Sequence, residues 1–150
     1  MVQITQEMRA KAEIMYGDEI CREGTKILLK EVGLPTGLLP LKDIIECGYV
    51  KETGFVWLKQ KNQIQHKFEK LGRVAFYATE ITGYVEKYKI KKMTGVKVKE
   101  LLIWITMSEA YLQDPSTGRI TFKTPAGLYR SFPAAAFESD EAPKVMLVNN

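Results

Sequence analysis

His66 is the only histidine among the 150 residues, so a serine–histidine–carboxylate triad would have to use it. A zinc site built from several imidazoles is excluded for the same reason. His66 alternates with Gln65 and Lys67 in a segment that has the pattern of a strand, and no serine lies in the glycine-flanked turn of α/β hydrolases. We therefore expect a structural role for His66. Hydrolysis of an ester-like substrate, with His66 as general base, is an alternative function.

Cys21 and Cys47 are the only cysteines, and neither belongs to a C-x-x-C motif. A thiol nucleophile or redox pair needs an activating neighbour, so two reduced, buried side chains are the favoured interpretation. The chain also lacks a glycine-rich phosphate loop and the ligand spacing of zinc or calcium sites. We therefore expect no catalytic residue, no metal and no cofactor.

Positive charge is concentrated in the middle of the chain. The net charge is +4, but residues 59–99 alone contain eleven Lys and Arg against three Glu. Alternation along two strands would place several of these side chains on one sheet face, where they could bind phosphates or anionic lipid headgroups. The alternative is that lysines protect edge strands from aggregation. The predicted basic face consists of Tyr84, Lys87, Tyr88, Lys89, Lys91, Lys92, Lys97 and Lys99.

Several aromatic residues fall on alternating strand positions. If the sheet curls into a barrel or roll, such side chains can line a mouth that hosts an apolar molecule. Ordinary core packing is the alternative. The predicted apolar pocket consists of Phe55, Trp57, Phe76, Trp104 and Phe122.

The first 32 residues have the periodicity of a helix. Thr5 can cap it, apolar residues recur at helical spacing as far as Leu28, and Gly33 and Pro35 end it. Gly17 weakens the helix, so a break or kink is expected at residues 16–18. The connector at residues 33–40 contains two glycines and two prolines, and it brings leucines to the core.

From residue 45 the periodicity changes to two, which predicts strands. A turn at residues 51–54 joins the first two into a hairpin, and the turn at residues 114–118 joins two later ones. A short break is expected at Glu80 and Ile81. The unbroken apolar run of residues 101–105 predicts a central strand covered on both faces. The predicted strands are residues 45–49, 55–58, 64–69, 73–79, 82–90, 96–107, 111–112, 120–122 and 127–132.

These patterns predict a mostly β, single-domain antiparallel β barrel, roll or sandwich preceded by one N-terminal α-helix. Residues 1–32 form the helix packed on the domain, residues 33–138 the β domain, and residues 139–150 an acidic, flexible tail. With 45% hydrophobic and 27% charged residues, general disorder is excluded. No secretory signal or membrane-spanning run is present, so a cytoplasmic location is expected. We expect a monomer that does not bind nucleic acid.

Four motifs occur together and in order: residues 33–40 (GLPTGLLP), 81–83 (ITG), 95–101 (GVKVKEL) and 131–138 (SFPAAAFE). With them, residues 32–138 resemble the plant family catalogued as domain of unknown function 538. The resemblance implies a plant source and an all-β fold of meandering strands after an N-terminal helix. Many relatives look secreted and carry a cysteine shortly after the Trp57 strand, whereas Asn62 and Gln63 occupy that region here. That difference favours an intracellular branch.

The resemblance implies no reaction and transfers no catalytic residue. Family members have been compared with bactericidal permeability-increasing lipid-binding proteins and linked to stress responses. The leading hypothesis is therefore a noncatalytic binding module for an amphiphilic small molecule or an anionic membrane surface, acting in plant stress response. A protein-interaction adaptor is the third interpretation, beside the hydrolase.

Overall fold

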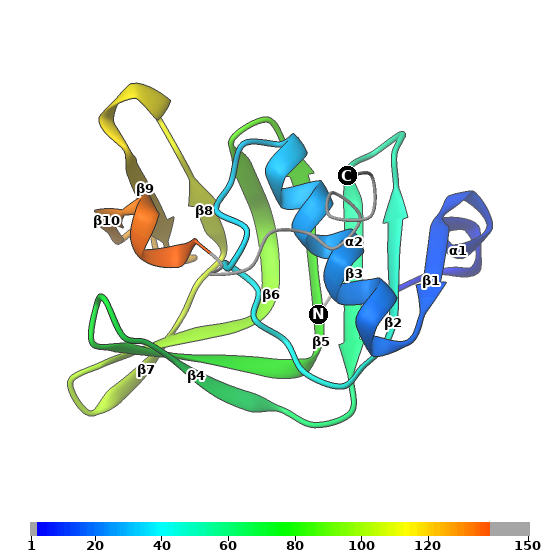
Figure 1. The fold of residues 1–150 in the computed structure, drawn as a ribbon, viewed down its shortest axis with the longest axis horizontal. Coiled ribbons are helices and arrows are strands. Elements are labelled where there is room, and N and C mark those ends of the chain that lie inside the picture. Colours follow the sequence, from blue (N-terminus) through cyan, green and yellow to red (C-terminus); the bar gives the residue numbers. More distant parts are fainter. Residues whose placement is uncertain (1–2, 139–150) are drawn as a thin grey trace, which may run out of the picture.

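The computed structural model describes residues 3–138, so the predicted tail at residues 139–150 lies outside the described part of the chain. Ten strands of this part form one antiparallel sheet in the order β1-β2-β3-β5-β6-β8-β9-β10, with β4 paired to β5 and β7 to β6 (Figure 1). The strands are β1 (Glu13–Tyr16), β2 (Ile44–Val50), β3 (Phe55–Gln60), β4 (Ile64–Phe68), β5 (Arg73–Glu86), β6 (Lys89–Glu100), β7 (Ile103–Thr106), β8 (Glu109–Tyr111), β9 (Arg119–Lys123) and β10 (Tyr129–Pro133). The helical elements are α1 (Gln6–Lys11), α2 (Asp18–Glu31), η1 (Pro115–Thr117) and η2 (Ala134–Phe137).

The sheet bends along its two longest strands, β5 and β6, so that β8, β9 and β10 come to one side of α2 and β1, β2 and β3 to the other (Figure 1). Among the described residues β1 pairs only with β2, and β10 only with β9, so the sheet does not close. The predicted mostly β, single-domain antiparallel fold is confirmed as an open roll rather than a closed barrel. None of the helices in residues 3–138 is long and apolar enough to cross a membrane.

The N-terminal segment is not one helix. Thr5 does cap a helix, accepting a hydrogen bond of 3.1 Å from the Met8 amide, but that helix ends at Lys11. Residues 13–16 then pair with β2 as strand β1, because alternation places Ile14 and Met15 against apolar clusters on opposite faces of the sheet. Gly17, with φ of +100°, makes the turn into α2. The expected kink is therefore a short strand between two helices.

Two strand predictions also need correction. Residues 80 and 81 do not interrupt a strand, since β5 runs through them and adapts by shifting its register against β6 between Tyr77 and Thr82. The apolar run at residues 101–105 is not a central covered strand. Leu101 and Leu102, which are 92% and 91% exposed, form the turn between β6 and β7, and the strand that follows is the short β7. Apolar composition alone did not reveal that this run crosses a turn.

Apolar side chains pack on both sides of the sheet. The main cluster fills the roll, and it includes Leu34 and Leu38 of the connector, Leu41 just after it, and Phe122 and Phe137. A smaller cluster of Val50, Phe55 and Trp57 lies under α1. The chain therefore uses α1 and α2 to cover opposite faces of the β2–β3 region.

Candidate ligand cavity between helix and sheet

A cavity of about 390 Å³ lies between α2 and the sheet; we call it the α2 cavity. Cross-strand register places Cys47, Leu58 and Ile81 in one row of its floor, with Tyr49, Val56 and Gly83 in the next. The roof is made of α2 residues. The full lining is Glu13, Met15, Gly24, Thr25, Ile27, Leu28, Leu29, Glu31, Leu39, Cys47, Gly48, Tyr49, Lys51, Val56, Trp57, Leu58, Ile81, Thr82, Gly83, Val85, Ile90 and Met93.

Hydrogen bonds attach α2 to the rest of the fold at both of its ends. The side chain of Asp18, the first residue of α2, accepts a hydrogen bond of 3.0 Å from the Ile44 amide. At the other end, the carbonyl of Val32, which follows the last residue of α2, accepts a hydrogen bond of 2.6 Å from the Tyr88 amide. Only Cys21 and Leu29 of α2 are buried. Gly24 on the helix and Gly83 on the sheet border the cavity without a side chain, and the Met15 methyl group lies where a Cβ atom of Gly24 would be. Near its middle, at Gly24, the helix contacts Met15 of β1, and the α2 cavity opens beside this contact.

The polarity of the α2 cavity is uneven. Most of its lining is aliphatic, methionine or aromatic, and it also includes Thr25, Cys47 and the buried Thr82. The charged members of the lining, Glu13, Glu31 and Lys51, are all exposed, so they lie at its mouth. Few polar groups at one end of an apolar cleft are typical of sites for small organic ligands. A second apolar space inside the roll measures about 40 Å³, which holds no more than a few atoms.

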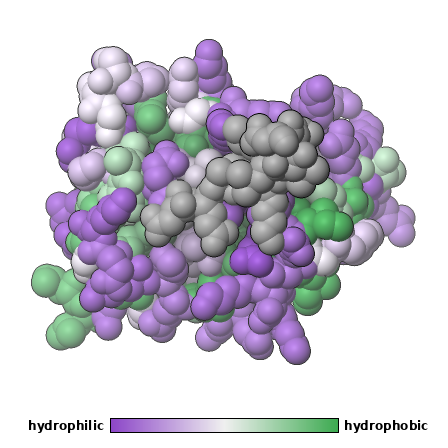
Figure 2. Space-filling model, in the orientation of Figure 1, coloured by the Kyte–Doolittle hydropathy of each residue, from purple (hydrophilic) through white to green (hydrophobic). Residues whose placement is uncertain are grey.

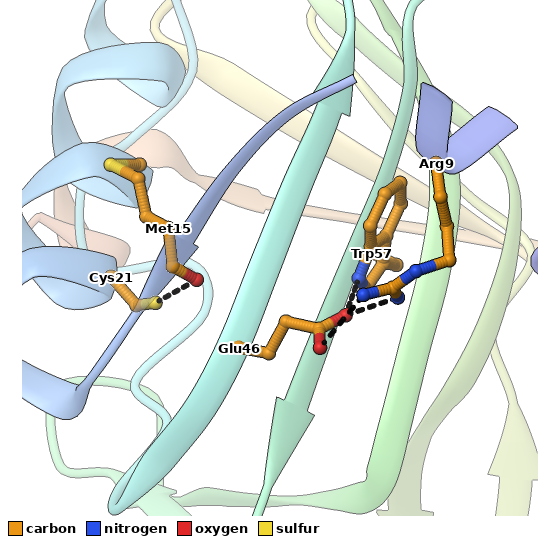
Figure 3. Close-up of polar contacts among 5 residues, drawn as sticks. All are labelled: Arg9, Met15, Cys21, Glu46 and Trp57. Atoms are coloured by element: carbon orange, nitrogen blue, oxygen red, sulfur yellow. Dashed lines mark hydrogen bonds and ion pairs between the residues drawn. The ribbon is translucent and has the colours of Figure 1, made fainter. Parts of the chain in front are cut away.

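The two cysteines meet beside the α2 cavity, one on α2 and one on β2. The Cys21 thiol donates a hydrogen bond of 3.4 Å to the Met15 carbonyl (Figure 3). Met15 in turn pairs with Cys47 across β1 and β2. Both thiols are free and buried. Burial raises the pKa of Cys21, and burial followed by the contact with Cys21 raises the pKa of Cys47. A neutral thiol is a poor nucleophile, so this pair does not have the properties of a reactive site.

We expect both thiols to react slowly with 5,5′-dithiobis(2-nitrobenzoate) in the native protein at pH 8, because burial blocks access and the raised pKa values deplete the thiolate. Absorbance at 412 nm measures the rate. In urea the same two cysteines should react at the rate of a free thiol, which serves as the control. A fast native phase that accounts for either cysteine would contradict the buried arrangement.

On the opposite face of the sheet, Glu46 joins α1 to β3. Its carboxylate accepts hydrogen bonds of 2.6 and 3.3 Å from Arg9 and one of 2.7 Å from the Trp57 indole (Figure 3). The Arg9 hydrogen bond holds the pKa of Glu46 below its ordinary value, although burial opposes this shift. Arg9 and Trp57 both use the Glu46 carboxylate as their acceptor, so the trio holds α1 in place rather than binding a ligand. This group of three side chains could not be predicted from the sequence, because Arg9 and Glu46 are 37 residues apart along the chain.

The predicted basic face is divided into two groups by the length of β6. The first group surrounds the β5–β6 turn, where most charges already have protein partners. Two lysines lie over tyrosine rings, Lys87 over Tyr88 at 5.2 Å and Lys92 over Tyr84 at 5.6 Å, and two form ion pairs, Lys89 with Glu109 at 3.3 Å and Lys91 with Glu86 at 3.0 Å. The second group, Lys97 and Lys99, lies near the other end of β6.

The aromatic residues of the predicted apolar pocket lie in three places. Phe55 and Trp57 belong to the cluster under α1, with ring centroids 6.0 Å apart. Phe76 and Trp104 contact each other at 6.1 Å beside the β6–β7 hairpin. Phe122 packs on Phe137 at 5.2 Å in the main core. Of the five, only Trp57 borders the α2 cavity. The cavity residues that the sequence did not single out are mostly small or aliphatic, types that carry no specific functional signal.

His66 lies on β4 and contacts Phe68, with ring centroids 4.6 Å apart. Burial, followed by the charge of Lys42, lowers the pKa of His66. Among residues 3–138 no hydrogen bond joins this imidazole to a serine hydroxyl: Ser108 bonds the Lys123 carbonyl, Ser116 bonds Asp114, and Ser131 bonds Thr121. The same part of the chain contains no group of three or more His, Cys, Asp or Glu that could hold a metal ion.

Comparison with known proteins gives one family. Neither a curated protein nor a solved structure matches the chain. A family model described as "Protein of unknown function, DUF538" matches residues 25–138, which covers the second half of α2, the lining of the α2 cavity from Thr25 onward, and the sheet from β2 to β10. Because this match spans most of the 150 residues, the chain belongs to the DUF538 family.

Proposed function

We propose that the protein is a noncatalytic binding module that holds one amphiphilic small molecule in the α2 cavity. The observation that carries the proposal is the cavity itself, about 390 Å³ with a mostly apolar lining and charged residues only at its mouth. Ligand sites in proteins usually measure roughly 300–1,000 Å³, so this cavity suits a single chain or a small ring system. The apolar part of the ligand would contact Val56, Leu58 and Ile81, and its polar end would remain near Lys51 and the two glutamates.

The contacts that fasten α2 support the same proposal. A helix held at both ends can adjust its middle turns around a guest without losing its attachment to the sheet. Met15, whose flexible side chain reaches the position where a side chain of Gly24 would lie, can repack as the cavity fills. The two free thiols fit a reducing compartment, and we propose a cytoplasmic location on that ground.

Filling the cavity tests this proposal. Val56 is half-buried on its floor, and Val56→Phe adds a ring to the space that the ligand would occupy. The matched control is Thr79→Phe, which adds the same ring to an exposed position of β5 outside the cavity. Titration with the amphiphilic dye 1-anilinonaphthalene-8-sulfonate, followed by displacement with a long-chain fatty acid, measures binding. We expect saturable one-to-one binding that Val56→Phe weakens at least tenfold and Thr79→Phe leaves within twofold.

Two outcomes would contradict the proposal. Equal dye affinity in wild type and Val56→Phe would place the binding elsewhere, and a wild type with no saturable binding of either probe would leave the cavity without a ligand. Circular dichroism of each variant checks that the sheet is intact. With a folded Val56→Phe protein, loss of binding is then due to loss of space and not to unfolding.

A further inference from the structure

The end of the β6–β7 hairpin exposes a contiguous group of apolar side chains. Leu101 and Leu102 form the turn, Ile103 is 62% exposed, and Trp104 is 38% exposed; we call residues 101–104 the hairpin tip. Leu101 has φ of +56°, a conformation that glycine and asparagine adopt more readily than leucine. Figure 2 shows the resulting hydrophobic projection at the lower left, over the end of this hairpin. Contiguous exposed apolar groups of this kind mark interaction sites.

Basic side chains surround the hairpin tip. Lys97 and Lys99 project from β6 on the same face as Trp104 and Phe76. The Lys97 ammonium group lies 5.8 Å from the centre of the Phe76 ring, and the Lys99 ammonium group lies 5.7 Å from the centre of the Trp104 ring. Within residues 3–138 neither of these lysines has a carboxylate partner within ion-pair distance. This group therefore differs from the lysines of the β5–β6 turn, two of which are paired with glutamates.

The β4–β5 hairpin adds positive charge beside the hairpin tip. The register of β5 with β6, in which Ala75 opposes Val98, brings the β4–β5 turn beside the hairpin tip (Figure 1). Lys67 and Lys70 at that turn are exposed, and only Lys67 has an ion pair, with Glu69 at 3.9 Å. On the inner side Glu100 is neutralised by Arg73 at 2.7 Å and Arg130 at 3.2 Å. Positive charge is thus in excess all around the apolar turn.

We propose that the hairpin tip inserts into the surface of a membrane that contains anionic phospholipid. A convex turn with two leucines at its end presents too small and too curved a surface for a typical protein interface, which buries about 800 Å² on each partner. It suits a bilayer, where Leu101 and Leu102 enter the acyl boundary and Trp104 lies at headgroup level. Lys97 and Lys99 then contact lipid phosphates. This site is separate from the α2 cavity, and the proposal does not depend on a ligand there.

Vesicle co-sedimentation of the full chain tests the insertion. The vesicles are phosphatidylcholine alone or phosphatidylcholine with 30% phosphatidylserine, at 50 and 500 mM salt. We expect the wild type to bind the anionic vesicles at least tenfold more tightly than the neutral ones, with most of this preference lost at high salt. Trp104 gives a second readout, because Trp57 is fully buried: emission should shift to shorter wavelength on binding, and brominated lipid should quench it.

Matched variants separate the hairpin tip from the rest of the surface. Leu101→Ser/Leu102→Ser removes the apolar turn without touching the core, and Ile20→Ser/Ile45→Ser removes two other exposed aliphatic side chains as its control. Lys97→Glu/Lys99→Glu reverses charge at the tip, and Lys87→Glu/Lys92→Glu does so at the β5–β6 turn. We expect each tip variant to weaken binding at least tenfold and each control to stay within twofold.

Three results would overturn the proposal. The first is a wild type that does not sediment with anionic vesicles at low salt. The second is a Leu101→Ser/Leu102→Ser protein that binds as the wild type does. The third is self-association of the wild type, measured by analytical ultracentrifugation, that the leucine variant abolishes, since the tip would then contact a second copy of the chain. Dye binding in the α2 cavity should be the same in all four variants, so failure here leaves the ligand proposal unaffected.

Discussion

Gly48→Ala is expected to lower the free energy of unfolding by about 3 kcal/mol, because overpacking a rigid site forces neighbouring groups to move. A Cβ atom at position 48 would overlap the six-membered ring of Trp57, which lies directly opposite on β3. That indole is fully buried and hydrogen-bonded to Glu46 at 2.7 Å, so it cannot turn aside without losing its partner. Urea unfolding followed by circular dichroism measures the change.

Gly24→Ala is the matched control for this substitution. Both glycines have ordinary φ values, but the neighbour at Gly24 is the terminal methyl group of Met15, the far end of a flexible side chain. Alanine also favours a helix over glycine by about 1 kcal/mol, so Gly24→Ala should be neutral or stabilising. Equal effects at the two positions would show that the indole is not the rigid obstacle that its contacts indicate.

Glu46→Ala is expected to destabilise the protein by about 2–3 kcal/mol, since it leaves the buried Trp57 indole N–H without an acceptor. It also removes the two hydrogen bonds that attach α1 to the sheet through Arg9. Glu46→Gln is the informative comparison, because an amide oxygen can still accept from Trp57 while the charge interaction with Arg9 is lost. We expect its unfolding midpoint in urea to lie between those of the wild type and Glu46→Ala.

The pH dependence of this effect has a defined sign. Because the folded state lowers the pKa of Glu46, its stabilising contribution is complete above the unfolded value near 4.5 and is lost as the pH falls through the lower folded value. Glu100, whose pKa the Arg73 hydrogen bond lowers, adds a loss of the same sign. The stability difference between wild type and Glu46→Gln should therefore shrink between pH 5 and pH 3. A difference that stays constant over this range would argue against the carboxylate as its source.

The sequence predicted those elements in which local pattern and tertiary packing agree. The β2–β3 hairpin was expected from alternation on both sides of residues 51–54, and the structure pairs Val50 with Phe55 across that turn. The turn at residues 114–118 likewise joins β8 to β9, with Tyr111 opposite Thr121. Leu34 and Leu38 of the connector are buried, as expected. In each case a glycine or proline marked the turn and the flanking periodicity marked the faces.

Predictions from the sequence were wrong where one residue pattern is compatible with two structures. Residues 13–16 have helical spacing, but they pair with β2 as β1, which places Ile14 and Met15 on apolar clusters at opposite faces of the sheet. Residues 101–105 are as apolar as a buried strand, but Glu100 pairs with Ile103 across a turn, which leaves the two leucines between them in solvent. Composition alone does not separate a covered strand from an apolar turn.

The α2 cavity could not be predicted from the sequence, for a different reason. It depends on how α2 lies over the sheet, and the contacts of α2 at Asp18 and Val32 are with segments distant in the sequence. The residues that line it, such as Val56 and Ile81, have the same types as any core position. The predicted lysines were identified by type, but the register shifts between β5 and β6 and the bend of the sheet determine which of them share a surface.

The meandering order of the strands has a consequence for how the chain reaches this structure. Nearly every strand pairs with one that is close to it along the chain, and every pairing is antiparallel. Closing such short segments costs little chain entropy, and contacts of low sequence separation accompany rapid folding. Assembly can therefore proceed hairpin by hairpin from the centre outward, and only the joining of β1 to β2 requires the polypeptide to close a long loop around a helix.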